Sequence, residues 1–215
     1  MSSNYEAAVD SFLGMLGQTR LSTIDRVWKA FMAYSICLIA ESFRRKHYTL
    51  NVMNHTGGFR FKCFPQGNPN NYSYFLATKG TESLEIRLSI DAKNIRYYGL
   101  KLNLDIAIIR QNSINADNIV DTGTDLISFM ECKNFRGFPE LVAGFQGMVY
   151  ELQRFRLSNN SKANYPIPAC LLLSQSGRSI LFMDARYQRY NRSIRIFDML
   201  QPGSTSVTTF VQSWF

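Results

Sequence analysis

The spacing of apolar residues changes near residue 47, and this change constrains the fold more than any other feature of the sequence. Before it, apolar residues recur at helical spacing, and the segment 24–45 is apolar around much of its circumference. Such a helix is expected to pack on two sides. After it, apolar and polar residues alternate as they do in strands, first over 47–52 and then over 59–64. The pattern predicts N-terminal helices over 1–46, followed by sheet.

The rest of the chain mixes strand-like and helix-like segments. Strands are expected at 72–78, 84–90, 102–109, 126–135, 168–174, 179–184 and 193–199, and a helix at 140–156. Residues 110–125 are polar and read as a long connection. This order favours an α/β or α+β class with a central mixed sheet flanked by helices. No linker divides the chain, so we expect one domain over 1–215, with a mixed-sheet core at 47–200 and a C-terminal tail at 201–215.

Composition limits the partners and the location that we expect. Lysine and arginine outnumber aspartate and glutamate by 24 to 16, and this basic surplus favours a polyanion such as nucleic acid. The four cysteines form no CxxC pair, which indicates reduced thiols. No signal peptide or membrane span is apparent, so a cytoplasmic protein is expected. The chain has no phosphate-binding GK[ST] loop, which argues against ATP hydrolysis.

Charged residues interrupt two strands that are otherwise apolar. Asp105 lies within the segment LNLDIAII, and Glu131 and Lys133 lie two apart in FMECKN. Positions two apart in a strand share a face, so the Glu131 and Lys133 side chains are expected side by side. Charges inside apolar strands are costly unless they are paired or bind a metal. The sequence therefore predicts that these residues meet at one edge of the sheet and form a site.

The residue types at this site predict metal-dependent chemistry. Carboxylates of Asp105 and Glu131, together with the backbone carbonyl of Cys132, would give an all-oxygen site suited to Mg²⁺ or Mn²⁺. Such a metal polarises a phosphate and lowers the pKa of a bound water. Lys133 could position or deprotonate that water, or stabilise the developing charge.

These residues resemble the PD-(D/E)xK, or restriction-endonuclease-like, nuclease superfamily. Its pattern places an aspartate on one strand, then Glu or Asp, any residue and Lys on the next, followed by a helix. The resemblance covers about residues 28–185 and implies an αβββαβ core with an N-terminal helical extension. It also implies divalent-metal hydrolysis of phosphodiester bonds. Leu104 stands where the family often has proline. Gln146 and Tyr150 on the expected helix resemble the Gln-x-x-x-Tyr element of RecB-like members, which predicts that both face the site.

Several carboxylates compete for a further role as metal ligand. Many branches of the family add a glutamate from the first helix, and Glu41 is the candidate for that position. Glu85, in the strand TESLEIRLSI, is a rival for the same role. Asp121, in the polar connection, is an alternative to Asp105.

Two basic clusters are candidates for contacts with nucleic acid. The second of them interleaves tyrosines with arginines, as phosphate contacts and base stacking require. The candidate residues are Arg44, Arg45 and Lys46 in the first cluster and Arg186, Arg189, Arg192 and Arg195 in the second.

The expected function is a Mg²⁺- or Mn²⁺-dependent endonuclease that cuts DNA, and the family-level expectation for its role is restriction or phage defence. Two readings stay open beside it: an RNase that uses the same site, and a non-cleaving nucleic-acid-binding or assembly module with the same fold. A homodimer would let two active sites cut both strands.

Overall fold

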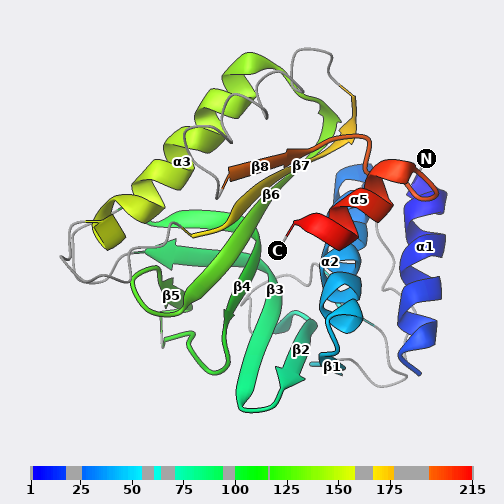
Figure 1. The fold of residues 1–215 in the computed structure, drawn as a ribbon, viewed down its shortest axis with the longest axis horizontal. Helices are drawn as coiled ribbons and strands as arrows, with labels where there is room; N and C mark the ends of the chain where they lie inside the picture. Colours follow the sequence, from blue (N-terminus) through cyan, green and yellow to red (C-terminus); the bar gives the residue numbers. More distant parts are fainter. Residues whose placement is uncertain are drawn as a thin grey trace.

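Helices pack on both faces of one eight-stranded sheet in the computed structural model (Figure 1). The structure describes residues 2–17, 26–54, 61–63, 71–93, 100–115, 117–157, 167–176 and 194–214. The N-terminal half contributes α1 (Ser2–Met15), α2 (Val27–Arg45), β1 (Thr49–Met53), β2 (Tyr74–Lys79), β3 (Glu82–Lys93) and β4 (Leu102–Arg110). The remainder contributes β5 (Ile119–Asp121), β6 (Leu126–Arg136), α3 (Pro139–Leu157), β7 (Ala169–Gln175), β8 (Ile194–Phe197) and α5 (Thr205–Ser213).

The sheet is mixed and mostly antiparallel. Its strand order is β1-β2-β3-β4-β6-β7-β8, with β5 paired to β3 outside this path. Neighbouring strands from β1 to β6 are antiparallel, whereas β6, β7 and β8 are parallel. The parallel step from β6 to β7 is made through α3, as a crossover requires. The mixed α/β class predicted from the sequence is confirmed at this level.

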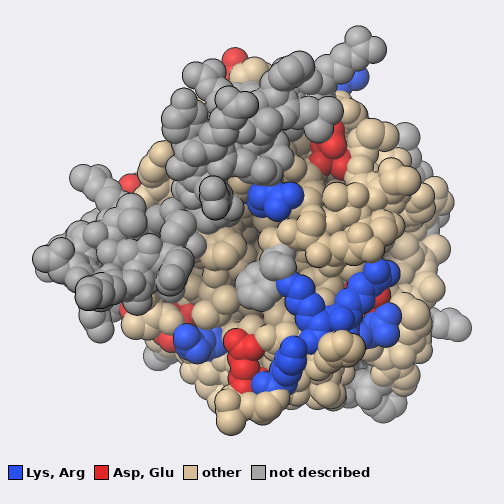
Figure 2. Space-filling model, viewed as in Figure 1, with Lys and Arg blue, Asp and Glu red and all other residues tan. Residues whose placement is uncertain are grey.

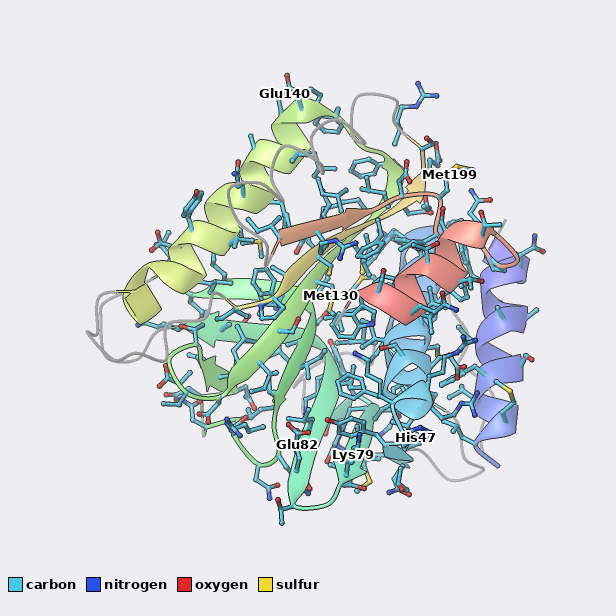
Figure 3. The ribbon with its side chains drawn as sticks, viewed as in Figure 1. His47, Lys79, Glu82, Met130, Glu140 and Met199 are labelled. Carbon is cyan, nitrogen blue, oxygen red and sulfur yellow. The ribbon has the colours of Figure 1, made fainter. Side chains whose placement is uncertain are left out.

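Two apolar cores lie on opposite faces of the sheet. The first packs α1, α2 and α5 against one face and includes Phe31, Ile39 and Met130. Figure 3 shows Met130 on the side of β6 that faces α2 and α5. The second packs α3 against the other face and includes Phe129 and Phe145. Because α2 lies between the sheet and other helices, its residues from Ala30 to Ala40 are all buried, as its apolar circumference predicts.

β3 and β4 exchange faces together at one point along their length. Leu88 and its partner Ile106 belong to the first core, yet Ile90 and its partner Leu104 belong to the second. Ser89, between these pairs, has a φ of 52°, in the left-handed region that non-glycine residues seldom adopt. In the register of the two strands, Ser89 lies opposite Asp105. The sheet is therefore kinked where the predicted aspartate stands.

The structure adds two elements that the sequence pattern did not reveal. The short strand β5 lies inside the predicted connection 110–125, and the helix α5 lies inside the predicted tail 201–215. α5 docks on the same chain: Trp214, directly after it, donates a hydrogen bond from Nε1 to Ser42 Oγ at 2.7 Å. Its threonines and valines favour helices weakly, so burial of Phe210 and Val211 against α2 stabilises it.

The remaining predicted elements agree with the structure in type, with two qualifications. Of the predicted strand 59–64, the structure describes only residues 61–63, and Phe61 and Cys63 are buried there. The predicted strand 179–184 lies outside the described residues. Among the helices that the structure describes, none has the length and apolar character needed to cross a bilayer.

Candidate active site

The candidate site lies where β4 and β6 stop pairing. Their antiparallel ladder ends at Ile106 and Met130, although β6 continues to Arg136 beside β7. In the gap, the Asp105 carboxylate replaces the missing strand partner, since Cys132 N–H donates to its Oδ2 at 2.8 Å. An unpaired backbone donor in a buried strand is costly, so this bond fixes the position of Asp105.

Lys133 joins the two predicted carboxylates. Its Nζ donates a short hydrogen bond to Glu131 Oε1 and lies 3.5 Å from Asp105 Oδ2. The side chains of Lys133, Asp105 and Glu131 are 27%, 21% and 15% exposed, so the cluster is accessible from solvent but largely enclosed. The structure thus brings together the three residues that the sequence singled out.

The Glu131 carboxylate has an unusual proton affinity. Burial raises its pKa, and the nearby negative charge of Asp105 raises it further, to about 7, although Lys133 opposes both effects. For Lys133, burial alone would lower the pKa, but the hydrogen bond to Glu131 and the charges of Asp105 and Glu131 outweigh it and raise the pKa. Lys133 is therefore a cation at neutral pH.

The donor atoms at this site fit a divalent metal. Glu131 Oε2 is buried and has no hydrogen-bond partner within the described part of the chain, which is costly for a carboxylate oxygen. The Cys132 carbonyl lies on the same side of β6 as its N–H, and therefore faces the same gap as Asp105. In the part of the chain that the structure describes, no group of three or more His, Cys, Asp or Glu side chains is placed to hold a metal ion by itself. Mg²⁺ needs only one or two protein carboxylates, because water and substrate phosphate complete its shell.

Two hollows meet at the cluster. One, of about 480 Å³, lies between the start of α2 and the end of β6, and its lining includes Trp28, Asp105, Lys133 and Phe135. The other, of about 370 Å³, lies between β6 and the first half of α3, and its lining includes Glu131, Lys133 and Phe138. Lys133 lines both. Volumes of this size suit small organic groups such as a nucleotide base.

Glu41 does not join the site. Its carboxylate is bound by Arg44 Nε at 2.7 Å and Arg45 Nε at 2.9 Å on the surface of α2. These ion pairs lower its pKa against the opposing effect of burial. Glu41 also lies nine residues beyond Met32, which lines the first hollow, and this spacing amounts to about 13 Å along a helix. The structure therefore does not bring Glu41 to the cluster: guanidinium groups bind its carboxylate, and the site is at the other end of α2. Its role as a metal ligand stays a prediction.

The first basic cluster forms a surface patch at the C-terminal end of α2. Lys79 Nζ donates to the Lys46 carbonyl at 2.9 Å, which brings the β2–β3 hairpin next to Arg44 and Arg45. Burial and the charge of Lys79 lower the pKa of Lys46. Figure 2 shows basic side chains gathered in this region, with Glu82 beside Lys79 as labelled in Figure 3. The patch is separate from the hollows, and its contact with nucleic acid stays a prediction.

The two alternative carboxylates have structural partners elsewhere. Glu85 is 2% exposed and binds Arg87 Nε at 2.5 Å and Asn112 N–H at 3.1 Å. It pairs with Ile109 across β4, four residues from Asp105. Asp121 closes the turn after β5 by accepting from Gly123 N–H at 2.9 Å and from Thr124 Oγ1. Neither belongs to the cluster around Lys133.

Gln146 and Tyr150 are not brought to the cluster. The residues of α3 that line the second hollow include Leu141, Gly144 and Met148. At 100° per residue, Gln146 and Tyr150 lie on nearly the opposite side of the helix from these positions. Tyr150 is 54% exposed. The predicted orientation of this pair toward the strand is therefore not found.

Of the second basic cluster, the structure describes Arg195 alone. Its guanidinium lies 5.0 Å above the Phe197 ring, and it donates to the Ser213 carbonyl at 3.4 Å, so it helps to dock α5 on β8. The other three residues, Arg186, Arg189 and Arg192, lie outside the described residues.

Sequence reasoning missed the aromatic residues around the site. Trp28, Phe135 and Phe138 are 43%, 42% and 44% exposed and line the two hollows. Aromatic residues in a strand or helix usually indicate core. The one available signal was that Phe135 continues the alternation of Glu131 and Lys133, and so shares their face.

This chain matches no protein-family model, no curated protein and no solved structure. We therefore infer its function from the geometry of the site.

Proposed function

We propose that this chain is a Mg²⁺- or Mn²⁺-dependent phosphodiester hydrolase. Its active site, formed by Asp105, Glu131 and Lys133, cuts DNA. One observation carries the proposal: these residues converge at a gap in the sheet where the buried Glu131 Oε2 has no partner among the described residues. A carboxylate that served only an ion pair would be expected to have both oxygens bonded. Apart from β5, which lies between β4 and β6 in the chain and pairs outside the main strand path, the elements β3, β4, β6, α3 and β7 follow the βββαβ order that the resemblance implies, and this order supports the proposal.

Each residue has a distinct role in this proposal. Asp105, Glu131 and the Cys132 carbonyl would hold the metal, which when bound polarises the scissile phosphate and acidifies a water. Lys133 remains protonated, since its pKa is raised. Its ammonium therefore orients the phosphate and stabilises the negative charge that develops on it, rather than removing a proton from water. The Cys132 N–H holds Asp105 in position.

One observation favours a second candidate, a nucleic-acid-binding module that does not cleave. Lys133 contacts both carboxylates, so the cluster is partly neutralised without any metal. In that case, the ion pairs of Lys133 with the two carboxylates would only stabilise the fold. The basic residues that the chain has in excess would bind phosphates. An RNase with the same site is the third reading, because no residue described here distinguishes a ribose from a deoxyribose.

The test is cleavage of plasmid, linear duplex, single-stranded DNA and RNA with Mg²⁺, Mn²⁺ or EDTA. We expect metal-dependent cutting of DNA that is lost in Lys133→Ala. The matched control is Lys101→Ala, which removes an exposed cation that pairs with Asp91 on a neighbouring strand. Calorimetry should show Mg²⁺ or Mn²⁺ binding that Asp105→Ala abolishes. Binding of DNA without cleavage under any condition would support the second candidate instead, and cutting of RNA alone would support the third.

A further inference from the structure

Three large aromatic side chains line the two hollows beside the site. Trp28 comes from the first turn of α2, Phe135 from the end of β6 and Phe138 from the connection to α3. Elements far apart in sequence therefore deliver aromatic groups to one place. Each ring leaves more than two fifths of its surface exposed, although large apolar groups are normally buried. Such a concentration indicates a surface that binds a partner.

Two of the three rings stack on each other at the edge of the hollows. Phe135 and Phe138 are nearly parallel, with an interplanar angle of 19° and ring centroids 6.1 Å apart. Trp28 and Phe135 both line the first hollow, beside Asp105 and Lys133. Phe138 lines the second hollow, beside Glu131 and Lys133. The aromatic rings thus flank the place where a phosphate would meet the cluster.

Positive charge lies next to the aromatic surface. Lys29 Nζ lies 5.7 Å from the centre of the Trp28 ring, and Lys133, which pairs with Asp105 and Glu131, lines both hollows. Stacking rings combined with cations are the features that bind single-stranded nucleic acid, because every unpaired base offers a flat face and every nucleotide carries a phosphate. A duplex keeps its bases stacked on one another, so it cannot place them against these rings without unstacking.

We propose that the aromatic surface of Trp28, Phe135 and Phe138 binds unpaired bases, so that the site takes a single-stranded polynucleotide. A base occupies the first hollow against Trp28 and Phe135, and the adjoining phosphate lies at Lys133. This inference rests on the proposed function for the position of the phosphate, and it adds the strandedness of the substrate. DNA and RNA share the chemistry of the unpaired base, so the experiment tests both.

The experiment measures binding in EDTA, where cleavage is absent. Fluorescein-labelled oligo-dT and oligo-rU of twelve nucleotides are compared with a hairpin duplex by anisotropy, at one low salt concentration. We expect both single strands to bind more tightly than the duplex. Trp28→Ala should weaken single-strand binding by about 5- to 100-fold, as for the loss of one stacked base. Trp28→Phe, which keeps an aromatic ring, should restore most of the affinity.

Intrinsic fluorescence gives an independent measurement. The chain has two tryptophans, and Trp214 is 3% exposed. Quenching of tryptophan emission by unlabelled oligonucleotide should therefore report stacking on Trp28, and it should disappear in Trp28→Phe. Met15→Ala is the matched control for an exposed apolar residue, at 64% exposure. Met15 is remote from Trp28, because it lies at the last residue of α1, whereas Tyr5, near the start of α1, contacts Phe31 in the first turns of α2.

The outcomes separate this inference from the proposed function. Equal binding of duplex and single strands, or unchanged binding by Trp28→Ala, would overturn it even if the protein cuts DNA. If the protein binds neither oligo-dT nor oligo-rU, the inference is also overturned. A protein would then be the remaining candidate partner for the aromatic surface. Strand-selective binding with quenching, in a protein that never cleaves, would support the inference and refute the hydrolase.

Discussion

Two strands of this sheet carry the same local pattern, a glutamate followed two residues later by a cation. Glu85 and Arg87 lie on β3, and Glu131 and Lys133 lie on β6. In both pairs the cation binds the glutamate of its own strand. The surroundings of the two pairs differ, and this difference separates a structural ion pair from a candidate active site.

The β3 pair is closed. Glu85 uses one oxygen for Arg87 and the other for the backbone N–H of Asn112, and both Glu85 and Arg87 are buried. The Arg87 guanidinium also stacks on Tyr74, 3.7 Å from the ring centre. Every charged group therefore has a partner, as burial demands. Nothing in this pair is left for a ligand.

The β6 pair is open. Glu131 has one oxygen without a partner among the described residues, and a second carboxylate, Asp105, lies close enough to raise its pKa. Lys133 lines two hollows instead of packing under a ring. Incomplete pairing beside a cavity is costly for stability and useful for binding. The comparison teaches that the E-x-cation pattern alone does not identify a site.

The largest expected effect is the loss of cleavage in Glu131→Gln. This change removes a carboxylate from the proposed metal site while keeping its shape, so we expect single-turnover cutting with Mg²⁺ to slow on the order of 10⁴-fold, about 5 kcal/mol. Glu85→Gln, measured at a temperature where it is folded, should cut within about tenfold of wild type. Equal losses in both variants would break the comparison.

Stability should show the opposite order. Glu85→Gln leaves a buried Arg87 charge without its counter-ion, and we expect urea unfolding to report a loss of about 3–5 kcal/mol. Glu131→Gln, in metal-free buffer at pH 7.5, should lose less than about 1 kcal/mol or gain stability, because it removes repulsion from Asp105. A large loss in Glu131→Gln would assign that residue to the fold.

The pH dependence of stability should report the raised pKa of Glu131. In the folded chain Glu131 holds its proton up to about pH 7, but an ordinary glutamate has a pKa of 4.5. Between these values the folded state binds more protons, so its stability falls as pH rises. In EDTA, wild type should lose about 2–3 kcal/mol relative to Glu131→Gln between pH 4.5 and pH 7. A parallel pH profile for the two proteins would contradict the raised pKa.

A small effect is expected when the cation of the closed pair is exchanged. Arg87→Lys keeps the charge but loses the planar contact with Tyr74, which should lower the free energy of unfolding by about 1 kcal/mol. The double-mutant cycle with Tyr74→Leu measures the part that comes from stacking. A coupling energy near zero would show that the contact with Tyr74 does not stabilise the pair.

Much of the architecture could be predicted because periodicity reports burial. The all-round apolar pattern of 24–45 correctly indicated that α2 packs on two sides, and the strands that carry Asp105 and Glu131 fall where alternation placed them. The helix α5 was missed because Thr205, Val207 and Thr209 carry little helical preference of their own. Its stability comes from docking on α2, and a local pattern cannot show that.

Among candidate residues, local rules succeeded for neighbours on one strand and failed for groups whose partners are distant. The alternation of strand residues by itself determined that Glu131 and Lys133 share a face. The sequence also determined that Glu41 and Arg45 lie one helical turn apart, yet their pairing became evident only in the structure. Only the tertiary structure decided that Cys132 N–H donates to Asp105 and that Asn112 N–H donates to Glu85. It also decided that Trp28 and Phe135 line the same hollow. The physical reason is that burial and electrostatic interactions depend on distance in space, whereas side-chain direction depends on the backbone within a few residues.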